Sequence, residues 1–536
     1  MYYHLRGHLN CWNEITMQCP RFLRAGARAK GQVELMAGKS SASVPSLLDH
    51  THIQPFEDMP TPSGPRSWPV IGALFNFKPF TEFTGVTIHR LLNQLHEELG
   101  ETFRIRLGKW YVCTADPEAM ETIIRHEEKY PVRPSLDLYE TYVRRENRPV
   151  NLGVLNGKEW WQLRKRVQKK LLPPRSALVY LPAQNKVADE FIALLKSKHL
   201  SAHELRETYF RFAVEAISVV VFNKRMGFLS PDTIPQDCEE YLTAVKEFFA
   251  VFNTFIGKAP LYRFFRTPMY MRMKRAADKA YEFSNKAATE AIQRGLELEK
   301  TGKWDPGEAN FILSLFASGS QSVDEISSIM QDLMVGGTDS TAKNLEFFLY
   351  ALASHPDVQD TLYTEVLREV GPTGPVTEEA LSNMPYLKAC QKEGFRMRYP
   401  VPTGTARILQ NGLNLNGYYI PKDTIVIMNN PRLLKNPEYV KDPDKYQPDR
   451  WLRNSSGQLT NNIPGVGLLP FSFGPRKCVG QRFAEQELNL AAVKVLQNFK
   501  ISLPEGFEEP EIIYEVFGTF SKPIPFIFTP REQIQS

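Results

Sequence analysis

Between about residues 155 and 400, apolar side chains recur at three- and four-residue spacing, with short breaks rich in proline and glycine. This spacing puts apolar residues on one helix face, so it predicts a long and mostly helical region. Apolar and polar positions alternate at 102–107 and 110–113, and short strand-like runs return at 417–421 and 424–428. We therefore expect a mainly α fold with minor β sheets.

Composition divides the chain into three segments. Residues 1–48 hold six Lys or Arg against two Glu, so we expect 1–50 to be a mitochondrial transit peptide that is removed. A tail without a targeting role is the alternative. Residues 51–72 form a proline-rich lead-in, in which the prolines favour extended backbone over helix. Residues 73–536 show no internal repeat and no shift in composition, so we expect one large domain there.

Charge and cysteine usage exclude several classes of protein. The net charge is +5, but beyond residue 48 the chain carries 59 basic and 58 acidic side chains, which argues against a nucleic-acid binder. The six cysteines are scattered without paired spacing. This indicates neither a disulfide framework nor a zinc site, and it favours a reducing compartment.

One cysteine lies in a loop of distinctive composition, Phe471-Ser-Phe-Gly474-Pro-Arg476-Lys-Cys478-Val-Gly480, followed by a helical pattern over 481–496. The start of a helix and nearby cations favour a thiolate at Cys478. The two glycines let the backbone approach a flat cofactor closely, where a Cβ would clash. The alternative is a buried structural cysteine.

This loop resembles the haem-binding loop of the cytochrome P-450 family, Phe-x-x-Gly-x-Arg-x-Cys-x-Gly, with every defining position filled. The resemblance implies a triangular prism of helices that encloses haem b, which is iron protoporphyrin IX. It implies that Cys478 is the axial ligand of the iron and that the loop contacts the cofactor through Phe471, Gly474, Arg476 and Gly480.

A second segment, 329–353, reads as a long helix with two central glycines, Gly336 and Gly337, which predict a local distortion. It is similar to the oxygen-binding helix of the family, Gly-Gly-x-Asp-Thr-Thr. By that likeness the glycines leave space for O2, and Asp339 and Ser340 deliver protons. Serine stands where the family has threonine, and Thr341 can share the relay. A hinge without chemistry is the alternative.

Glu393 and Arg396 are spaced to meet on one helix face. They resemble the Glu-x-x-Arg pair of the family, which a third arginine completes, here Arg450 in Pro448-Asp-Arg450-Trp451. The resemblance implies a buried structural network that holds the cysteine loop. A surface ion pair is the alternative for Glu393 and Arg396.

Trp160 and Arg164 lie one helical turn apart and resemble the Trp-x-x-x-Arg motif that meets the haem propionates in the family. The planar donor fork of arginine suits a carboxylate. Arg476 and Arg407 are further candidates for the same carboxylates. The alternative for each arginine is a solvated position on the surface.

Lys388 and Lys392 are four residues apart on the helix before Glu393 and form a small basic spot. In the mitochondrial branch of the family, lysines at these places engage an acidic, adrenodoxin-like iron–sulfur ferredoxin. Arg482 extends this basic face past the cysteine loop. Two solvated lysines without a partner are the alternative.

The resemblance implies a haem-thiolate monooxygenase that uses O2 and ferredoxin electrons on the matrix side of the inner mitochondrial membrane, in peripheral membrane contact. Apolar and aromatic segments at 136–139, 248–252, 401–404 and 515–520 favour a lipophilic substrate, such as a sterol, secosteroid or xenobiotic. The alternatives are a haem-thiolate isomerase or dehydratase without a reductase, a non-catalytic haem sensor or carrier, and a microsomal enzyme that takes electrons from a flavoprotein reductase.

Overall fold

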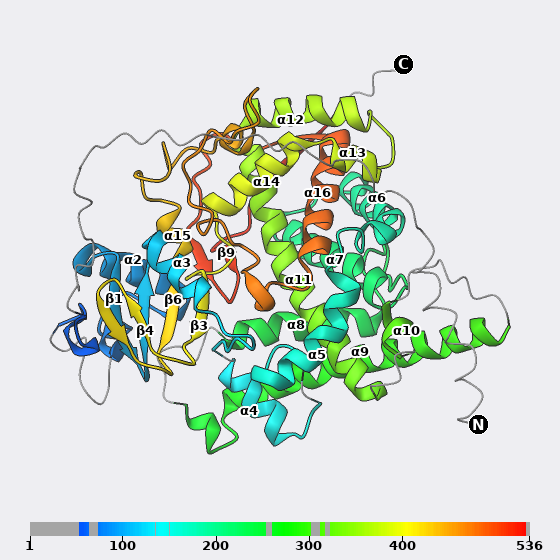
Figure 1. Cartoon of the computed structure of the whole chain (residues 1–536). Coiled ribbons are helices and arrows are strands. Elements are labelled where there is room, and N and C mark those ends of the chain that lie inside the picture. The colour runs from blue at the N-terminus through cyan, green and yellow to red at the C-terminus, as the bar shows by residue number, and fades with distance from the viewer. Residues whose placement is uncertain are drawn as a thin grey trace, which may run out of the picture. The chain divides into compact units, whose positions relative to one another are not determined.

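The computed structural model describes residues 53–63, 73–134, 136–149, 151–252, 260–301, 311–316 and 322–531. The expected transit peptide, 1–50, lies outside these residues, as do 64–72 of the lead-in. Helices predominate, as the sequence predicts (Figure 1). The α-helices are α2 (Ile88–Leu99), α3 (Pro117–Arg125), α4 (Asp137–Arg145), α5 (Gly157–Leu171), α6 (Leu181–Ser197), α7 (Ala202–Val221), α8 (Gln236–Phe252), α9 (Pro268–Lys300), α10 (Phe311–Phe316), α11 (Val323–Ala353), α12 (Pro356–Glu369), α13 (Glu378–Ser382), α14 (Pro385–Met397), α15 (Asn430–Leu433) and α16 (Gln481–Asn498).

Short elements complete the described residues. The 3-10 helices are η1 (Phe56–Asp58), η3 (Ala73–Asn76), η4 (Gly85–Thr87), η5 (Leu178–Tyr180), η6 (Leu261–Arg263), η7 (Pro448–Trp451) and η8 (Gly474–Arg476). The strands are β1 (Thr102–Leu107), β2 (Lys109–Thr114), β3 (Thr405–Ile408), β4 (Leu413–Leu415), β5 (Tyr418–Ile420), β6 (Ile425–Met428), β7 (Phe499–Ser502), β8 (Ile512–Tyr514), β9 (Gly518–Phe520) and β10 (Ile527–Pro530). The strands predicted at 102–107, 110–113, 417–421 and 424–428 are confirmed as β1, β2, β5 and β6.

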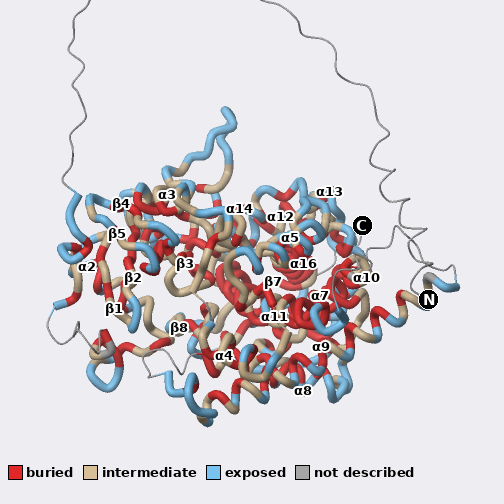
Figure 2. Tube along the Cα trace, turned by 60° about the horizontal axis from the view of Figure 1, so that its bottom comes forward, coloured by how far each residue is buried: buried red, intermediate tan, exposed pale blue. Residues whose placement is uncertain are grey.

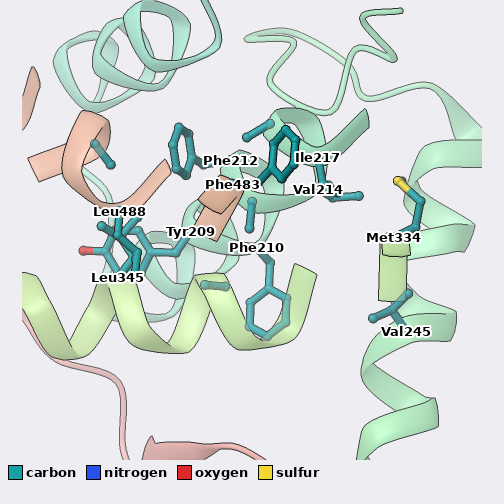
Figure 3. Close-up of a cluster of buried hydrophobic side chains, with 14 of the residues drawn as sticks. Tyr209, Phe210, Phe212, Val214, Ile217, Val245, Met334, Leu345, Phe483 and Leu488 are labelled. Carbon is teal, nitrogen blue, oxygen red and sulfur yellow. The ribbon is translucent and has the colours of Figure 1, made fainter. Parts of the chain in front are cut away.

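Helix α11 is the central element of the helical core, where it packs against α7, α9 and α16. It begins at a capping box, in which Ser322 Oγ accepts from Glu325 N (3.2 Å) and Glu325 Oε2 accepts from Ser322 N (2.9 Å). Long stretches of α7, α11 and α16 are buried (Figure 2). The close-up in Figure 3 shows apolar side chains from these helices in one cluster, including Phe212, Leu345 and Phe483.

Two smaller apolar cores lie at the sheets. Strand order in the main sheet is β1-β2-β6-β3, with only the β2–β6 pair parallel. The described part of the lead-in joins this region, because Gln54 bridges to Tyr418 and both Phe56 and Met59 are buried. Among the described helices, none is both long and apolar enough to cross a membrane.

Candidate functional site

The cysteine loop, 471–480, contains η8 and leads into the start of α16. Cys478 N donates to Phe471 O (2.8 Å), which closes the loop. Gly474 has φ +60°, and a Cβ there would collide with the Glu127 carboxylate. The positive φ favours glycine at this position, and the Glu127 carboxylate occupies the space that a Cβ would take.

Cys478 is desolvated by the surrounding protein, which raises its pKa, while backbone N–H groups of Gly480 and Gln481 and the charges of Arg164 and Arg133 lower it. Burial therefore opposes the thiolate that the helix start and the cations favour. Unlike the other described cysteines, Cys478 is nevertheless exposed. Protein surrounds Cys478, but part of its surface stays accessible. A sulfur that binds a metal needs this access.

Helix α11 has an accessible stripe although most of its residues are buried. Asp332, Gly336 and Ser340 recur at every fourth residue and keep accessible surface, and nothing lies within 4 Å of a Cβ added at Gly336. The predicted distortion is wrong, because α11 is a continuous α-helix from Val323 to Ala353. Gly336 leaves space beside the helix without interrupting it.

The acid and the hydroxyls that the sequence singled out follow this stripe. Ser340 Oγ donates to Gly336 O (2.7 Å). Thr341 is buried, and its Oγ1 has no hydrogen-bond partner in the part of the chain that the structure describes. Asp339 is also buried, where desolvation raises its pKa against the opposing charge of Lys343. Of the two hydroxyl side chains, Ser340 is the one with accessible surface.

Guanidinium groups gather beside the cysteine loop. Arg164 Nη2 donates to Lys477 O, and Arg476 lies over the indole of Trp160, with 3.7 Å from its guanidinium carbon to the ring centroid. Arg407 forms an ion pair with Glu127 (2.5 Å) and donates to Phe473 O (3.3 Å). The structure therefore brings together the candidates named for the propionates, although α5, β3 and the cysteine loop are distant in sequence.

This cluster holds more positive charge than its carboxylates balance. Burial and the charges of Arg133, Arg407 and Arg164 lower the pKa of Arg476 to about 8. Arg476 Nη1 is buried and has no hydrogen-bond partner among the described residues. Because a guanidinium keeps its proton in proteins, the cluster is destabilised until an anion joins it. The two propionates of haem fit that need, so the residues present suit the cofactor.

Sequence reasoning missed three members of the cluster. Arg133 is half-buried and interacts electrostatically with Arg407 and Cys478, and its pKa is lowered chiefly by desolvation. Asn156 accepts from Arg133 N (3.1 Å) and from Arg476 Nη2, so it holds two of the arginines in place. Glu127 is the carboxylate that pairs with Arg407. Arg133 lies in a proline-containing run of the sequence, whereas nothing in the sequence distinguishes Asn156 or Glu127.

Glu393, Arg396 and Arg450 meet in a buried network. Glu393 and Arg396 form a bidentate pair (2.8 and 2.9 Å), and Arg450 Nε donates to Glu393 Oε1 (2.9 Å). The indole of Trp451 and the backbone N–H of Gln447 also donate to the same carboxylate, at 2.7 and 3.0 Å. The network joins α14 to η7, and the alternative of a surface pair is excluded by its burial.

The basic side chains named for a redox partner lie on two helices that contact each other. Lys388 and Lys392 are exposed on α14, and Arg482 is exposed in the first turn of α16. The two helices meet where Gln391 Nε2 donates to Glu485 O (3.5 Å). Burial of part of Lys388, together with the charge of Lys392, lowers the pKa of Lys388.

Three of the four apolar segments named for a substrate come together through aromatic contacts. Tyr139 of α4 lies edge-on to Phe248 of α8, with ring centroids 5.2 Å apart. Phe249 meets Phe517 of the β8–β9 turn at 6.1 Å. These side chains connect α4, α8 and the hairpin in one aromatic region.

Comparison with known proteins agrees with this geometry. The profile of the cytochrome P-450 family matches residues 62–529. Cytochrome P-450 10 of Lymnaea stagnalis is 28% identical over 497 residues, which cover 90% of this chain and 87% of that protein. Mitochondrial sterol 26-hydroxylase of Mus musculus is 27% identical over 533 residues, 96% of each chain. Mitochondrial 1,25-dihydroxyvitamin D(3) 24-hydroxylase of Mus musculus is 28% identical over 473 residues, 87% of this chain and 88% of that protein. The chain therefore belongs to the cytochrome P-450 family and is a monooxygenase whose cofactor is haem b, bound through a cysteine thiolate.

Proposed function

We propose that this monooxygenase hydroxylates a sterol, a secosteroid or a xenobiotic in mitochondria, with electrons from an adrenodoxin-like iron–sulfur ferredoxin. The observation that carries the choice of donor is the exposed basic surface formed by Lys388, Lys392 and Arg482. A small acidic donor would be steered to such a surface for brief encounters. The mitochondrial relatives support the location.

Haem supplies the oxygen chemistry, and the protein supplies binding, orientation and protons. Cys478 is the proposed ligand of the iron, in a loop completed by Phe471, Gly474 and Gly480. Arg133, Trp160, Arg164, Arg407 and Arg476 are the proposed donors to the propionates. Of the two glycines named for O2, Gly336 leaves the space, and Gly337 packs against Ile217 of α7.

Proton supply is assigned to the centre of α11. Asp339 is the acid, and Ser340 is the hydroxyl that passes its proton into the space beside Gly336. Thr341 is the second hydroxyl within reach of this part of the helix. Ser340 is preferred because its side chain keeps accessible surface, whereas Thr341 is buried.

The choice of a lipophilic substrate rests on the aromatic region between α4, α8 and the β8–β9 turn. Apolar and aromatic side chains of this kind line sites that bind lipophilic molecules. Sterols and a secosteroid are named for two of the relatives. We assign the enzyme to the matrix side of the inner membrane, in peripheral contact with the lipid, after removal of residues 1–50.

Turnover with purified donors tests the electron source. The ferredoxin with its reductase should support product formation, whereas a microsomal flavoprotein reductase should not. Charge reversal of the two lysines, Lys388→Glu with Lys392→Glu, should raise the KM for ferredoxin and leave peroxide-driven turnover unchanged. The matched control reverses exposed lysines at the sheet, Lys109→Glu with Lys422→Glu. Equal turnover with the flavoprotein reductase would refute the proposed donor.

Optical titration tests the substrate class. A sterol, a secosteroid and a lipophilic xenobiotic are added separately to the ferric enzyme. A true substrate displaces the water from the iron and shifts the Soret band, and the same compound should then be hydroxylated in the ferredoxin system. If no lipophilic compound shifts the band while a polar one does, the substrate assignment is wrong.

A further inference from the structure

A chain of three charges begins at the buried Asp339 and ends at a partly exposed carboxylate. Lys343 lies one turn further along α11, and its Nζ donates to Asp339 Oδ2 and to Glu515 Oε2, each at 3.0 Å. The side chains of Asp339 and Lys343 are 2% and 5% exposed, whereas Glu515 is 35% exposed. One ammonium therefore connects a buried carboxylate to one that reaches solvent.

Glu515 reaches α11 from the turn of the β8–β9 hairpin. Tyr514 pairs with Gly518, and Glu515 N donates to Phe517 O (3.1 Å) across a tight turn at Val516. Val516 has φ 127°, a conformation that is strained for a β-branched residue. The structure keeps a strained turn at the point where the second carboxylate meets Lys343.

The β8–β9 hairpin lies close to α11, which makes the contact between Glu515 and Lys343 possible. A Cβ at Gly518 would lie 3.2 Å from the ring of Phe347 on α11 and 3.0 Å from the ring of Tyr514. Glycine therefore lets β9 pack directly on the helix, within reach of the Lys343 ammonium.

Stability alone gives a weak reason for this arrangement. Taking an ammonium and a carboxylate out of water is costly, and well-packed apolar side chains at such positions are often as stable or more so. The ion pair also lies beside the helix centre to which the acid role is assigned. A functional reason for retaining it is therefore the stronger one.

Given the proposed role of Asp339 as proton donor, we propose that Lys343 and Glu515 are its positioning residues. Lys343 holds the Asp339 carboxylate, and Glu515 links this ion pair to solvent at the hairpin turn. Neither residue touches the reacting atoms. Both act through Asp339, whose supply of protons they govern.

The surrounding charges determine in which direction each substitution shifts the pKa of Asp339. Burial raises the pKa of Asp339, the ammonium of Lys343 lowers it, and the charge of Glu515 raises it. On the far side of Lys343, Glu346 of α11 is paired with Arg206 of α7 (3.1 Å). Removing the ammonium should therefore shift the pKa of Asp339 upward, and removing the charge of Glu515 should shift it downward.

Infrared titration of the haem-loaded, full-length enzyme measures the pKa of Asp339 directly. The carboxyl band of Asp339 is identified as the one lost in Asp339→Asn. Its titration midpoint should rise in Lys343→Met, fall in Glu515→Gln, and return towards the wild-type value in Lys343→Arg. Unchanged midpoints in both Lys343→Met and Glu515→Gln would overturn the proposal.

Coupling of electron use to product formation is the functional readout. Lys343→Met should lose coupling and release more hydrogen peroxide, while Lys343→Arg should restore it. The controls are Lys494→Met, which removes a buried lysine of α16 paired with Asp189 (2.8 Å), and Glu511→Gln beside the same hairpin. Equal loss of coupling in these controls would contradict a specific role for Lys343 and Glu515.

Asp339→Asn separates this proposal from the proposed function. If Asp339→Asn keeps full coupling, Asp339 is not the proton donor and the assignment of the acid fails. If Asp339→Asn uncouples the enzyme and Lys343→Met does not, the assignment of the acid stands and only the positioning role fails.

Discussion

At the scale of single residues, burial decides which acidic side chains have unusual proton affinity. Asp332 lies on the accessible stripe of α11, and burial raises its pKa to about 7 although the backbone N–H of Gly153, Arg133 and the backbone N–H of Leu152 oppose the shift. Its Oδ2 accepts from Gly153 N (3.1 Å), which ties the segment before α5 to the helix. The same segment carries Asn156, which holds Arg133 and Arg476.

This pKa predicts a dependence of stability on pH. The folded protein holds a proton on Asp332 up to about pH 7, whereas the unfolded chain holds it only up to about pH 4. The free energy of unfolding should therefore fall as the pH rises between these two values. Asp332→Asn keeps an oxygen that can accept from Gly153 but does not titrate. Urea unfolding from about pH 4 to 8 should therefore show a flatter profile for this variant. A profile identical to that of the wild type would contradict the prediction, and Asp360→Asn on the surface of α12 is the control.

At the scale of elements, two neighbouring glycines of α11 have different surroundings. A Cβ at Gly336 meets nothing within 4 Å, whereas a Cβ at Gly337 would lie 3.1 Å from Ile217 Cγ1 of α7. Gly337 is therefore needed for packing between helices, and Gly336 leaves accessible space at the proposed O2 site.

Alanine substitutions should separate these two roles. Each gains about 1 kcal/mol of helix propensity, but Gly337→Ala should lose part of that gain as Ile217 is displaced. Gly336→Ala should be the more stable variant in urea unfolding without a bound gas. It should also bind carbon monoxide more weakly, because its methyl group occupies the open space. Weaker carbon monoxide binding in Gly337→Ala than in Gly336→Ala would reverse the assignment.

The Glu393 network predicts a large and specific loss of stability. Glu393→Ala leaves Arg396 and Arg450 buried without their carboxylate, which should cost about 3–5 kcal/mol and speed the release of haem. Glu121→Ala breaks an exposed pair with Arg125 on α3 and should cost less than about 1 kcal/mol. Denaturant unfolding and haem transfer to an acceptor protein measure both effects, and equal costs for the two variants would contradict the network.

At the scale of the whole molecule, the charges beyond residue 48 are nearly balanced, and the proposed surface for the partner is the basic one formed by Lys388, Lys392 and Arg482. Salt screens charges over about 8 Å at physiological ionic strength, so the KM for ferredoxin should rise with added salt. Peroxide-driven turnover needs no partner and should not change. Steady-state kinetics across a salt series tests this, and a salt-independent KM would remove the basic surface from the docking site.

Much of the architecture was predictable from local pattern. Apolar spacing predicted α11 and α16, and alternation predicted β1 and β2, because the period of apolar positions differs between helices and strands. The motif Phe471–Gly480 pointed to Cys478 because its residues adjoin in sequence. The arginine cluster was only partly foreseen, since Asn156 and Glu127 carry no signal of their own and act only through contacts that folding creates.

The sequence by itself therefore determined the family and the cofactor and pointed to the cysteine proposed to bind it, since these depend on side chains a few residues apart. Tertiary structure decided how the charges of the site balance and which of its side chains keep accessible surface. Only the packed fold desolvates Cys478 enough to raise its pKa, collects four arginines from separate segments, and brings Glu515 to Lys343. Burial and long-range contacts set these properties, and neither can be read from local spacing.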